Sequence, residues 1–323
     1  MPVHTLNIGG ISCRNNLLLA PMAGISDAPL RLLCLRGGAG LVFAEMVSAM
    51  AVKYENARSV RMLGLEPGEH PCAMQIFGGD GEAVALAARA AIAGGADIVD
   101  LNCGCPVPKI VRSGAGVALM RDEKKFALVI RAAVAAAGKT PVTVKTRVGL
   151  KKGTVLAPRL AFIAQEEGAC AVTVHGRYAE AVHSGPVDMD AVAATCASVK
   201  IPVMGNGGIC DAKTGRAFLD AGCAGLMIGR AAAGDPLIFS RIAAELDGEK
   251  YAGPDQRAKA ALFLELLDMC AARYGEEPGL MRSRKVLGYW INGFPNCAHI
   301  RARFMATNDF HKARNLLKSE LCS

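Results

Sequence analysis

The segment Leu17-Leu-Leu-Ala-Pro-Met-Ala-Gly-Ile-Ser26 decides between two architectures that alternate strands with helices. It opens on a short, continuous apolar run, which is typical of a buried strand in a parallel sheet. In an open, doubly wound sheet, the first strand leads into the nucleotide-binding pattern Gly-x-Gly-x-x-Gly. The segment holds only one glycine, Gly24, so this pattern is absent. The sequence therefore favours a closed (β/α)8 TIM barrel in the α/β class.

Seven further apolar runs follow at the spacing expected of βα units, and most are bounded by Gly or Pro. The eight predicted strands are residues 17–22, 41–46, 72–77, 98–102, 142–147, 171–175, 203–206 and 225–229. Between them lie Ala- and Leu-rich stretches that begin near Asp, Pro or Glu and end near Gly, as helices do. The clearest predicted helices are residues 82–94, 122–137, 158–167 and 211–221. Residues 6–16, with Gly9-Gly10 inside, predict a small hairpin that closes the lower end of the barrel.

The composition changes after Leu246, where a polar stretch rich in Gly and Pro predicts a linker over residues 247–255. Residues 256–323 read as wholly helical, with turns expected at Pro278-Gly279 and at Gly293-Phe294-Pro295. From Asp255 onward there are 11 Lys and Arg against 7 Asp and Glu. We therefore expect a barrel over residues 1–246, the linker, and a small basic all-α domain over residues 256–323, whose charge permits an RNA partner.

The bulk composition suits a globular enzyme. Of the 323 residues 52% are apolar and 20% are charged, which excludes a disordered chain. The formal net charge of +8 permits a polyanionic partner. The 12 cysteines form no spaced pair of Cys-x-x-Cys motifs, and the start of the chain lacks a signal-peptide pattern. We expect a cytoplasmic protein with reduced thiols, no metal site, no membrane span and no stable protein partner.

Active residues of a TIM barrel lie at the carboxyl ends of its strands. Polar or reactive side chains stand at nearly every predicted strand end, which a barrel built only for stability would not need. These positions are Pro21-Met22, Glu45, Gln75, residues 102–106, Lys145-Thr146-Arg147, His175-Gly176-Arg177, Asn206-Gly207-Gly208 and Gly229-Arg230. The glycine-rich ends of the last two strands match the usual phosphate site of the fold, where backbone N–H groups reach phosphate oxygens. Tight turns that merely need glycine are the alternative.

Three of these side chains suit a flat, partly anionic cofactor. Lys145 ends an apolar strand, where a buried ammonium needs an anionic partner, although a lysine that reaches the surface is the alternative. The negative edge of a reduced flavin would serve as that partner. Gln75 can donate to and accept from the opposite edge of the ring. His175 lies beside the predicted phosphate loops and contacts the cofactor, unless it is a satisfied core histidine.

Cys105 is the predicted acid. It precedes Pro106, and residues 107–116 read as a flexible loop over the barrel mouth. A thiol with a pKa of about 8.5 is protonated at neutral pH and can donate that proton. The alternative is a small core residue, which is the commoner role of a cysteine.

Taken together, these motifs resemble the tRNA-dihydrouridine synthase family over nearly the whole chain. The resemblance is carried by the segments Leu19-Ala-Pro-Met-Ala-Gly-Ile-Ser-Asp27, Phe43-Ala-Glu-Met46, Met74-Gln-Ile-Phe-Gly78, Asp100-Leu-Asn-Cys-Gly-Cys-Pro106, Val144-Lys-Thr-Arg-Val-Gly149, Val174-His-Gly-Arg177 and Gly229-Arg-Ala-Ala-Ala-Gly-Asp-Pro236. The stretch Met281-Arg-Ser-Arg-Lys-Val-Leu-Gly-Tyr-Trp290 is similar to the bacterial B-type subgroup. Three positions depart from the family pattern: Tyr178-Ala179 replace Thr-Arg, Gly208 replaces Asp, and Val286 replaces His.

The resemblance implies an FMN-dependent oxidoreductase that reduces specific uridines of tRNA to dihydrouridine, with NADPH as reductant and Cys105 as proton donor. It implies RNA or substrate contacts from Asn102, Arg147, Arg177 and Lys285. The implied FMN contacts are Pro21, Met22, Gln75, Lys145, His175, Asn206, Gly207, Gly229 and Arg230.

Four alternatives stay open at the level of sequence. Ribosomal RNA is an alternative target, and NADH is an alternative reductant. A barrel flavoenzyme acting on a free small molecule, such as a dihydroorotate-type dehydrogenase, would share the phosphate loops and the lysine, although it needs no basic tail. A non-catalytic RNA-binding protein that keeps FMN as a structural element would not need Cys105.

Overall fold

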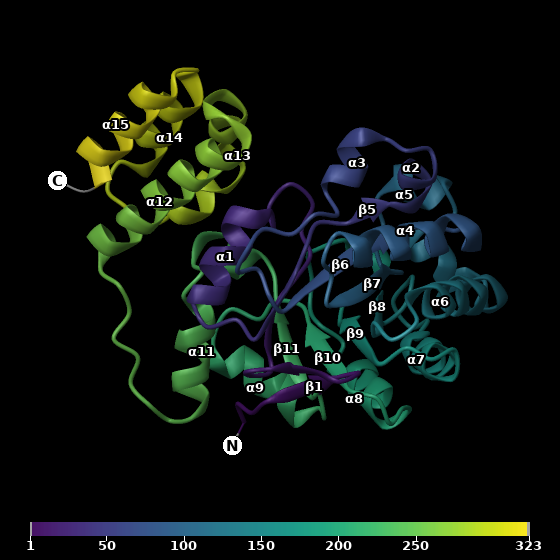
Figure 1. Ribbon diagram of the computed structural model, residues 1–323. Helices are drawn as coiled ribbons and strands as arrows, with labels where there is room; N and C mark the ends of the chain where they lie inside the picture. Colours follow the sequence, from purple (N-terminus) through teal and green to yellow (C-terminus); the bar gives the residue numbers. More distant parts are fainter. Residues whose placement is uncertain (1, 322–323) are drawn as a thin grey trace.

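The computed structural model describes residues 2–321 as a parallel barrel ringed by helices, with a group of helices beside its mouth (Figure 1). The barrel strands are β3 (Leu17–Leu19), β4 (Leu41–Phe43), β6 (Cys72–Phe77), β7 (Ile98–Asn102), β8 (Val142–Arg147), β9 (Ala171–His175), β10 (Val203–Asn206) and β11 (Gly225–Ile228). Each pairs in parallel with its neighbours, and the ring closes because β4 pairs with both β3 and β6. The TIM barrel expected from the sequence is confirmed.

The strand boundaries follow the apolar runs closely. The bounds of β6, β7, β8, β9 and β10 agree with the sequence prediction residue for residue. The first strand is shorter than predicted because Pro21 lacks the N–H that would continue its ladder. The predicted run 41–46 ends early as β4, and a short additional strand, β5 (Val47–Ser48), pairs with the upper end of β6.

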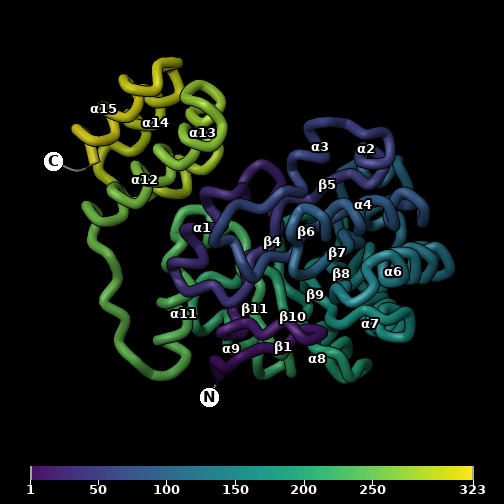
Figure 2. Tube along the Cα trace, viewed as in Figure 1, coloured from purple at the N-terminus to yellow at the C-terminus, as the bar shows by residue number. Residues whose placement is uncertain are grey.

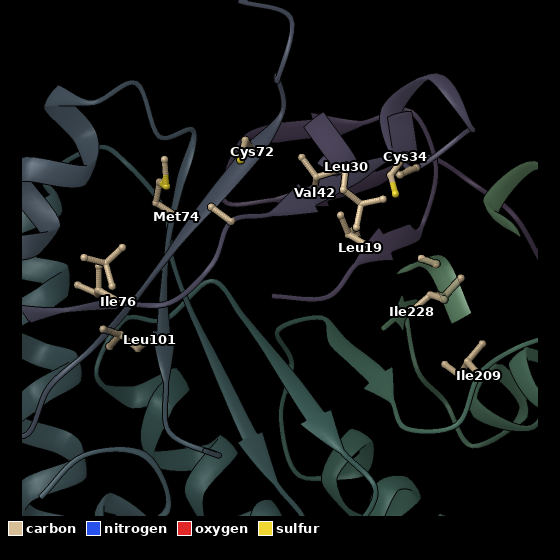
Figure 3. Packing of buried hydrophobic residues seen from close by; sticks show 14 of the residues in the cluster. Leu19, Leu30, Cys34, Val42, Cys72, Met74, Ile76, Leu101, Ile209 and Ile228 are labelled. Carbon is tan, nitrogen blue, oxygen red and sulfur yellow. The ribbon is translucent and has the colours of Figure 1, made fainter. Parts of the chain in front are cut away.

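An outer layer of helices covers the strands. It includes α1 (Ala28–Arg36), α4 (Gly81–Ala93), α6 (Glu123–Ala137), α7 (Ala157–Glu166), α8 (Met189–Ala197), α9 (Ala212–Asp220) and α11 (Ile238–Leu246). Aspartates begin several of them: Asp80, Asp122 and Asp211 each accept a hydrogen bond from a backbone N–H of the first turn. Figure 3 shows part of the apolar layer between strands and helices, where Leu19 and Val42 point outward from the barrel.

The predicted hairpin exists and seals the lower end of the barrel. Strands β1 (Leu6–Ile8) and β2 (Ile11–Cys13) pair antiparallel across Gly9 and Gly10, whose φ angles of 56° and 95° suit glycine. Leu6 and Ile8 pack into a second core with the inward-facing residues of the strands, Phe43 among them. In Figures 1 and 2 the hairpin lies at the end of the barrel away from the C-terminal helices. The opposite end is left for ligands.

We expect Phe43→Ala to lower the free energy of unfolding by about 3–5 kcal/mol, because it empties a fully buried site inside the barrel. Urea denaturation followed by circular dichroism measures this change. The matched control is Phe162→Ala on α7, where the ring is 41% exposed and the change should stay within about 0.5 kcal/mol. Equal effects of the two variants would contradict the packing of the barrel interior.

Residues 247–255 contain no helix or strand and lead to α12 (Gln256–Tyr274), α13 (Glu276–Trp290), α14 (Cys297–Ala306) and α15 (Phe310–Leu321). Residues 1, 322 and 323, which belong to the predicted domains, lie outside the described part. The predicted turn at Gly293-Phe294-Pro295 is confirmed. The turn predicted at Pro278-Gly279 is wrong, since both residues lie within α13.

Pro278 is accepted in the first turn of α13, because a helix makes no internal use of its first N–H groups. The chain instead turns at Gly275, whose φ is 89°. Gly279 has a packing role: a Cβ there would lie 2.7 Å from the backbone of Cys270 on α12. The glycine therefore allows the two helices to cross closely.

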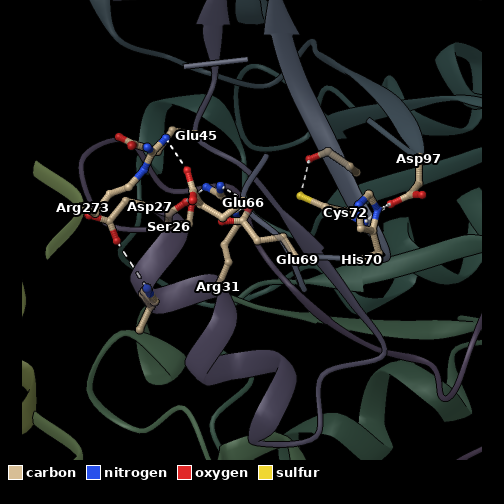
Figure 4. A network of polar contacts seen from close by, with 12 residues as sticks. Ser26, Asp27, Arg31, Glu45, Glu66, Glu69, His70, Cys72, Asp97 and Arg273 are labelled. Atoms are coloured by element: carbon tan, nitrogen blue, oxygen red, sulfur yellow. Dashed lines mark hydrogen bonds and ion pairs between the residues drawn. The ribbon is translucent and has the colours of Figure 1, made fainter. Parts of the chain in front are cut away.

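Ion pairs attach the C-terminal helices to the barrel. Arg273 pairs with Glu66 at 2.7 Å, and Figure 4 shows both residues near Asp27 and Glu45. Arg282 of α13 lies 3.4 Å from Asp27 and 3.8 Å from Glu45. The Arg282 guanidinium also lies 3.9 Å from the centre of the Tyr274 ring. Burial and the charge of Glu45 raise the pKa of Asp27 to about 6. Because Glu45 also accepts a hydrogen bond from Gly24 N, α13 is tied to the loop that follows β3.

Among residues 2–321, no helix is long and apolar enough to cross a membrane. The same residues bring together no group of three or more His, Cys, Asp or Glu that could hold a metal ion. The eleven cysteines within this range carry free thiols.

Candidate active site

A cavity of about 610 Å³ opens at the carboxyl ends of the barrel strands. Every site residue predicted from the sequence lines it, with the single exception of Lys285. These residues are Pro21, Met22, Gln75, Asn102, Cys105, Lys145, Arg147, His175, Arg177, Asn206, Gly207, Gly229 and Arg230. The structure thus brings together residues from five strands, β6 to β10, and from loops that include those after β3 and β11.

The two glycine loops after β10 and β11 lie on one side of this cavity. Gly207 has a φ of 130°, and a Cβ there would lie 2.9 Å from the Cδ2 atom of His175. Only glycine fits this position without displacing the histidine ring. Gly229 differs, because its added Cβ would meet nothing closer than 3.7 Å. A side chain at 229 would instead fill space at the edge of the cavity.

Lys145 is half-buried on the cavity wall. Its Nζ donates to Asn206 Oδ1 at 3.0 Å, and Asn206 in turn donates to the carbonyl of Met227 at 2.7 Å. Burial, followed by the charge of Arg147, lowers the pKa of Lys145 to about 8. The ammonium faces the cavity without a neighbouring carboxylate at salt-bridge distance in the described chain, so an anion would stabilise it.

His175 presents an unsatisfied nitrogen. Its Nε2 atom is buried and has no hydrogen-bond partner within residues 2–321. Burial and the charges of Lys145, Arg147 and Arg177 hold the pKa of His175 far below its usual range, so the ring is neutral. A neutral imidazole with an open nitrogen beside the Gly207 loop is suited to a hydrogen bond with a ligand.

Arg177 and Arg230 add positive charge to the wall of the same cavity. Arg177 donates to the carbonyl of Gly185 at 2.7 Å, and Arg230 donates to that of His183 at 3.0 Å. Both arginines therefore hold the loop that follows β9. The ring of His183 lies nearly parallel to that of His175, with 6.1 Å between their centres.

Cys105 lies half-buried on the cavity wall, and burial raises the pKa of its thiol despite the N–H of Val107 and the nearby charge of Arg147. The thiol is therefore protonated at neutral pH. Cys103, two residues earlier, is fully enclosed in the core between strands and helices. Of these two cysteines, only Cys105 faces the cavity.

The segment 107–116, predicted to be a flexible loop, is more ordered than expected. It contains the short helix α5 (Pro108–Arg112), which begins at a proline and buries Ile110. The carbonyl of Cys105 accepts a hydrogen bond from Val117 N at 3.1 Å, immediately beyond the segment. The prediction missed the helix because five residues carry too little periodicity to distinguish a helix from a loop.

Gln75 and Arg147 are engaged with the protein. The Gln75 amide donates to Asp100 at 2.7 Å and accepts from Asn102 at 2.9 Å, which leaves one N–H hydrogen for a ligand. Arg147 is buried, and its Nε donates to the carbonyl of Gly104 at 2.8 Å. This hydrogen bond supports the turn that carries Cys105.

Lys285 lies outside the cavity, on α13. Its ammonium lies next to the loop between β3 and α1. A Cβ added to Gly24 in that loop would lie 2.7 Å from Lys285 Nζ. One helical turn further on, Tyr289 lines the cavity and is 44% exposed. Sequence reasoning missed Tyr289, although the spacing of four residues places it on the same helix face as Lys285. It also missed His183, for which no signal in the sequence was evident.

The three departures from the family pattern have different surroundings. Tyr178 is buried and donates to Asp188 at 2.6 Å, while Val286 is buried among the C-terminal helices. Gly208 has a φ of 76°, and a Cβ there would lie 3.0 Å from Arg177 Nη2. Of the three, only Gly208 borders the cavity.

The residues present fit a flat, anionic cofactor that carries a phosphate. Three observations support this fit: the open Nε2 of His175, the Lys145 ammonium facing the cavity, and the cradle at Gly207 that a Cβ would fill. A closed barrel with such a site and a protonated thiol at its mouth defines a class of cofactor-dependent barrel enzymes.

Comparison with known proteins identifies the family. The model "Dihydrouridine synthase (Dus)" matches residues 18–322. The chain is 39% identical to tRNA-dihydrouridine synthase B of Pseudomonas putida, over 95% of this chain and 91% of that protein. It is 38% identical to a probable tRNA-dihydrouridine synthase of Rickettsia conorii, over 94% and 92% respectively. The chain belongs to the dihydrouridine synthase family, which confirms the resemblance found in the sequence.

Solved structures agree on the fold. The old yellow enzyme homologue of Zymomonas mobilis superposes with a TM-score of 0.58 at 14% sequence identity. The match covers 75% of this chain and 92% of that protein. At this level of identity the likeness extends to the barrel architecture alone.

Proposed function

We propose that this protein reduces uridines of tRNA to dihydrouridine, with FMN as its cofactor and NADPH as the reductant, in the cytoplasm. The observation that carries the proposal is the position of the protonated Cys105 thiol in the same cavity as Lys145 and the open Nε2 of His175. A hydride donor and a proton donor are the two groups that saturation of the uracil C5–C6 bond requires.

FMN would be held by the residues that line the cavity on both sides. The backbone of Gly207 and Gly229, with Arg230, would receive the phosphate. Lys145 and His175 would bind the ring edge that becomes negative, and the remaining Gln75 hydrogen would reach the opposite edge. Pro21, Met22 and Asn206 complete the walls. When bound, reduced FMN supplies the hydride.

Cys105 would supply the proton. Because burial raises the pKa of the thiol, Cys105 enters the reaction protonated and can deliver its proton to uracil C5. Arg147 and Asn102 hold the backbone of its turn, and the cations of Lys145 and Arg177 would stabilise negative charge on the uracil carbonyls. A uridine in folded tRNA must be flipped out to reach this depth.

The C-terminal helices, residues 256–323, would form the RNA-binding domain. Lys285 and Tyr289 lie on one face of α13 beside the cavity, where a cation can contact phosphate and an exposed aromatic ring can stack on a base. Arg177 would contact the RNA at the edge of the barrel. The excess of basic residues after Asp255 supports the same role.

We expect Lys285→Glu to weaken tRNA binding about tenfold and to lower the slope of log affinity against log salt by about one, because one phosphate contact is lost. Fluorescence anisotropy with labelled tRNA at several salt concentrations measures both quantities. The control is Lys139→Glu, an exposed lysine that precedes β8 at the opposite end of the barrel. An equal loss in both variants would mean that only net charge matters.

The decisive test of the function combines purified protein with RNA. We expect flavin absorbance in the purified protein and dihydrouridine in tRNA after incubation with NADPH. Mapping the product in both tRNA and ribosomal RNA from cells lacking the gene identifies the target, and a parallel reaction with NADH identifies the reductant. Turnover of free uracil or orotate without any response to tRNA would favour the small-molecule flavoenzyme. Bound flavin without any turnover would favour the non-catalytic role.

A further inference from the structure

The side-chain amide of Asn102, at the end of β7, uses its full hydrogen-bonding capacity within the protein. Its Oδ1 accepts from Gly104 N at 3.2 Å and from Cys105 N at 3.0 Å. Its Nδ2 donates to Gln75 Oε1 at 2.9 Å and contacts Met46 Sδ at 3.4 Å. Two lone pairs and two hydrogens are all that such an amide offers. A direct bond from Asn102 to a base would require one of these contacts to break.

A buried carboxylate stands at the other end of this chain of contacts. Gln75 Nε2 donates to Asp100 Oδ2 at 2.7 Å, and Thr143 Oγ1 donates to Asp100 Oδ1 at 2.6 Å. Asp100 is fully buried inside the barrel, and Gln75 is 1% exposed. Asp100 belongs to the sequence motif that contains Cys105, yet neither cofactor binding nor proton transfer assigns it a role.

We propose that Asp100, Gln75 and Asn102 form a directed hydrogen-bond chain that positions Cys105, with Asn102 as the positioning residue that acts on the Cys105 turn. The inference rests on the proposed function for its catalytic consequence, but the positioning itself concerns only residues of this chain. Asn102 would then act indirectly. By holding the backbone of the turn, it would fix the direction in which the Cys105 thiol points.

The direction of the chain is imposed from both ends. The ionised Asp100 carboxylate can only accept, so Gln75 must turn its NH2 group toward it and its oxygen toward Asn102. The N–H groups of Gly104 and Cys105 can only donate, so Asn102 must turn its oxygen toward them. Both amides are therefore held in the single orientation that satisfies every partner. An amide flip at either residue would bring two donors or two acceptors face to face.

Asn102 accepts hydrogen bonds from the N–H groups of the turn, and other residues donate to the carbonyl groups of the turn. Arg147 Nε donates to Gly104 O, and Val117 N donates to Cys105 O. Within the described chain, Gly104 N and Cys105 N have no acceptor besides Asn102 Oδ1. Removing this oxygen should thus loosen the turn locally while the carbonyl contacts keep the segment in place.

The test measures amide hydrogen exchange at residues 104 and 105 in the full-length protein as purified, together with kcat and KM for tRNA. We expect Asn102→Ala to raise exchange at both amides about tenfold or more, because the side-chain acceptor that both share is lost. We also expect kcat to fall at least tenfold while KM for tRNA stays within about twofold. Circular dichroism confirms folding. If this variant does not fold, Asn102→Ser keeps one hydroxyl acceptor and should show a smaller rise in exchange.

A pair of variants tests the direction of the chain. Asn102→Asp keeps the acceptor for both amides but places a carboxylate against Gln75 Oε1, so Gln75 must turn its oxygen toward Asp100. Adding Asp100→Asn supplies the missing donor and restores the net charge, with the two hydrogen bonds of Gln75 reversed and those to Gly104 N, Cys105 N and Thr143 unchanged. We therefore expect the double variant to recover at least fivefold in kcat over Asn102→Asp alone. A merely structural role would not produce this rescue.

Thr143→Val is the matched control. It removes the hydroxyl contact from the same carboxylate but leaves the bond between Asp100 and Gln75 intact, so exchange at residues 104 and 105 should stay within twofold of wild type. Unchanged exchange in Asn102→Ala, or no recovery in the double variant, would overturn the inference. Absence of product from the wild-type protein would instead overturn the proposed function, and the exchange data would still decide the positioning.

Discussion

Replacing Cys105 with alanine is expected to lower the rate of single-turnover uridine reduction by about 10²–10⁴-fold, the usual contribution of a positioned general acid. The structure supports this expectation because the thiol faces the cavity and its pKa is raised by burial, so the proton is present at neutral pH. The measurement is dihydrouridine formed per flavin after reduction of the enzyme and addition of tRNA. Affinity for tRNA should change little.

Cys210 provides the control for this prediction. It lines the same cavity but is exposed, and it lies beyond the Gly207 loop. Cys210→Ala should therefore retain nearly full activity. Cys105→Ser should remain slow, because a hydroxyl is a far weaker acid than a thiol. Full activity of Cys105→Ala would discard the thiol as the proton donor.

Lys145→Met is expected to lower the affinity for FMN by about 10–100-fold, which corresponds to the loss of about 1.5–3 kcal/mol for a hydrogen bond to a charged group. The affinity is measured by fluorescence titration of the cofactor-free protein. The control is Lys285→Met, which removes a cation just outside the cavity and should change FMN affinity less than twofold.

The pH dependence of stability and of FMN affinity distinguishes cofactor binding by Lys145 from a purely structural role of this residue. The pKa of Lys145 is lowered to about 8 from 10.5 by burial, so the unfolded chain holds more protons at this lysine between these two values. The stability of the cofactor-free protein should therefore gain from this residue as pH rises from 8 to 10.5. FMN affinity should fall as pH rises from 7 to 9, because the ammonium is being lost. Lys145→Met should remove both trends, and a flat wild-type profile would contradict the assignment.

The fold could be predicted from the sequence because each strand is a compact apolar run with a Gly or Pro near its end. Residues 142–147 and 171–175 were placed without error for this reason. Pro278 was misread because a proline near a glycine predicts a turn, whereas the first turn of a helix accepts it equally well. The short helix α5 was missed because five residues carry too little periodicity.

The cavity-lining residues could be predicted because parallel strands in a barrel all end on one face. What the sequence could not provide is which side chains bond to each other. Nothing in the order of residues shows that Asp100 faces Gln75, or that the Asn102 amide points back at its own turn. Tyr289 and His183 reach the cavity through the packing of α13 and the path of the β9–α8 loop, which are long-range properties.

The contact of Arg282 with Asp27 and Glu45 bears on any attempt to redirect this enzyme to another uridine by exchanging its C-terminal helices. A grafted segment that lacks a guanidinium at this point would leave Asp27 and Glu45 repelling each other, offset only by the weaker effect of Arg31, which already pairs with Glu69. Glu45 also holds Gly24 in the loop that lines the cofactor cavity. A working chimaera must therefore carry this arginine along with the new helices, or replace both acids on the barrel.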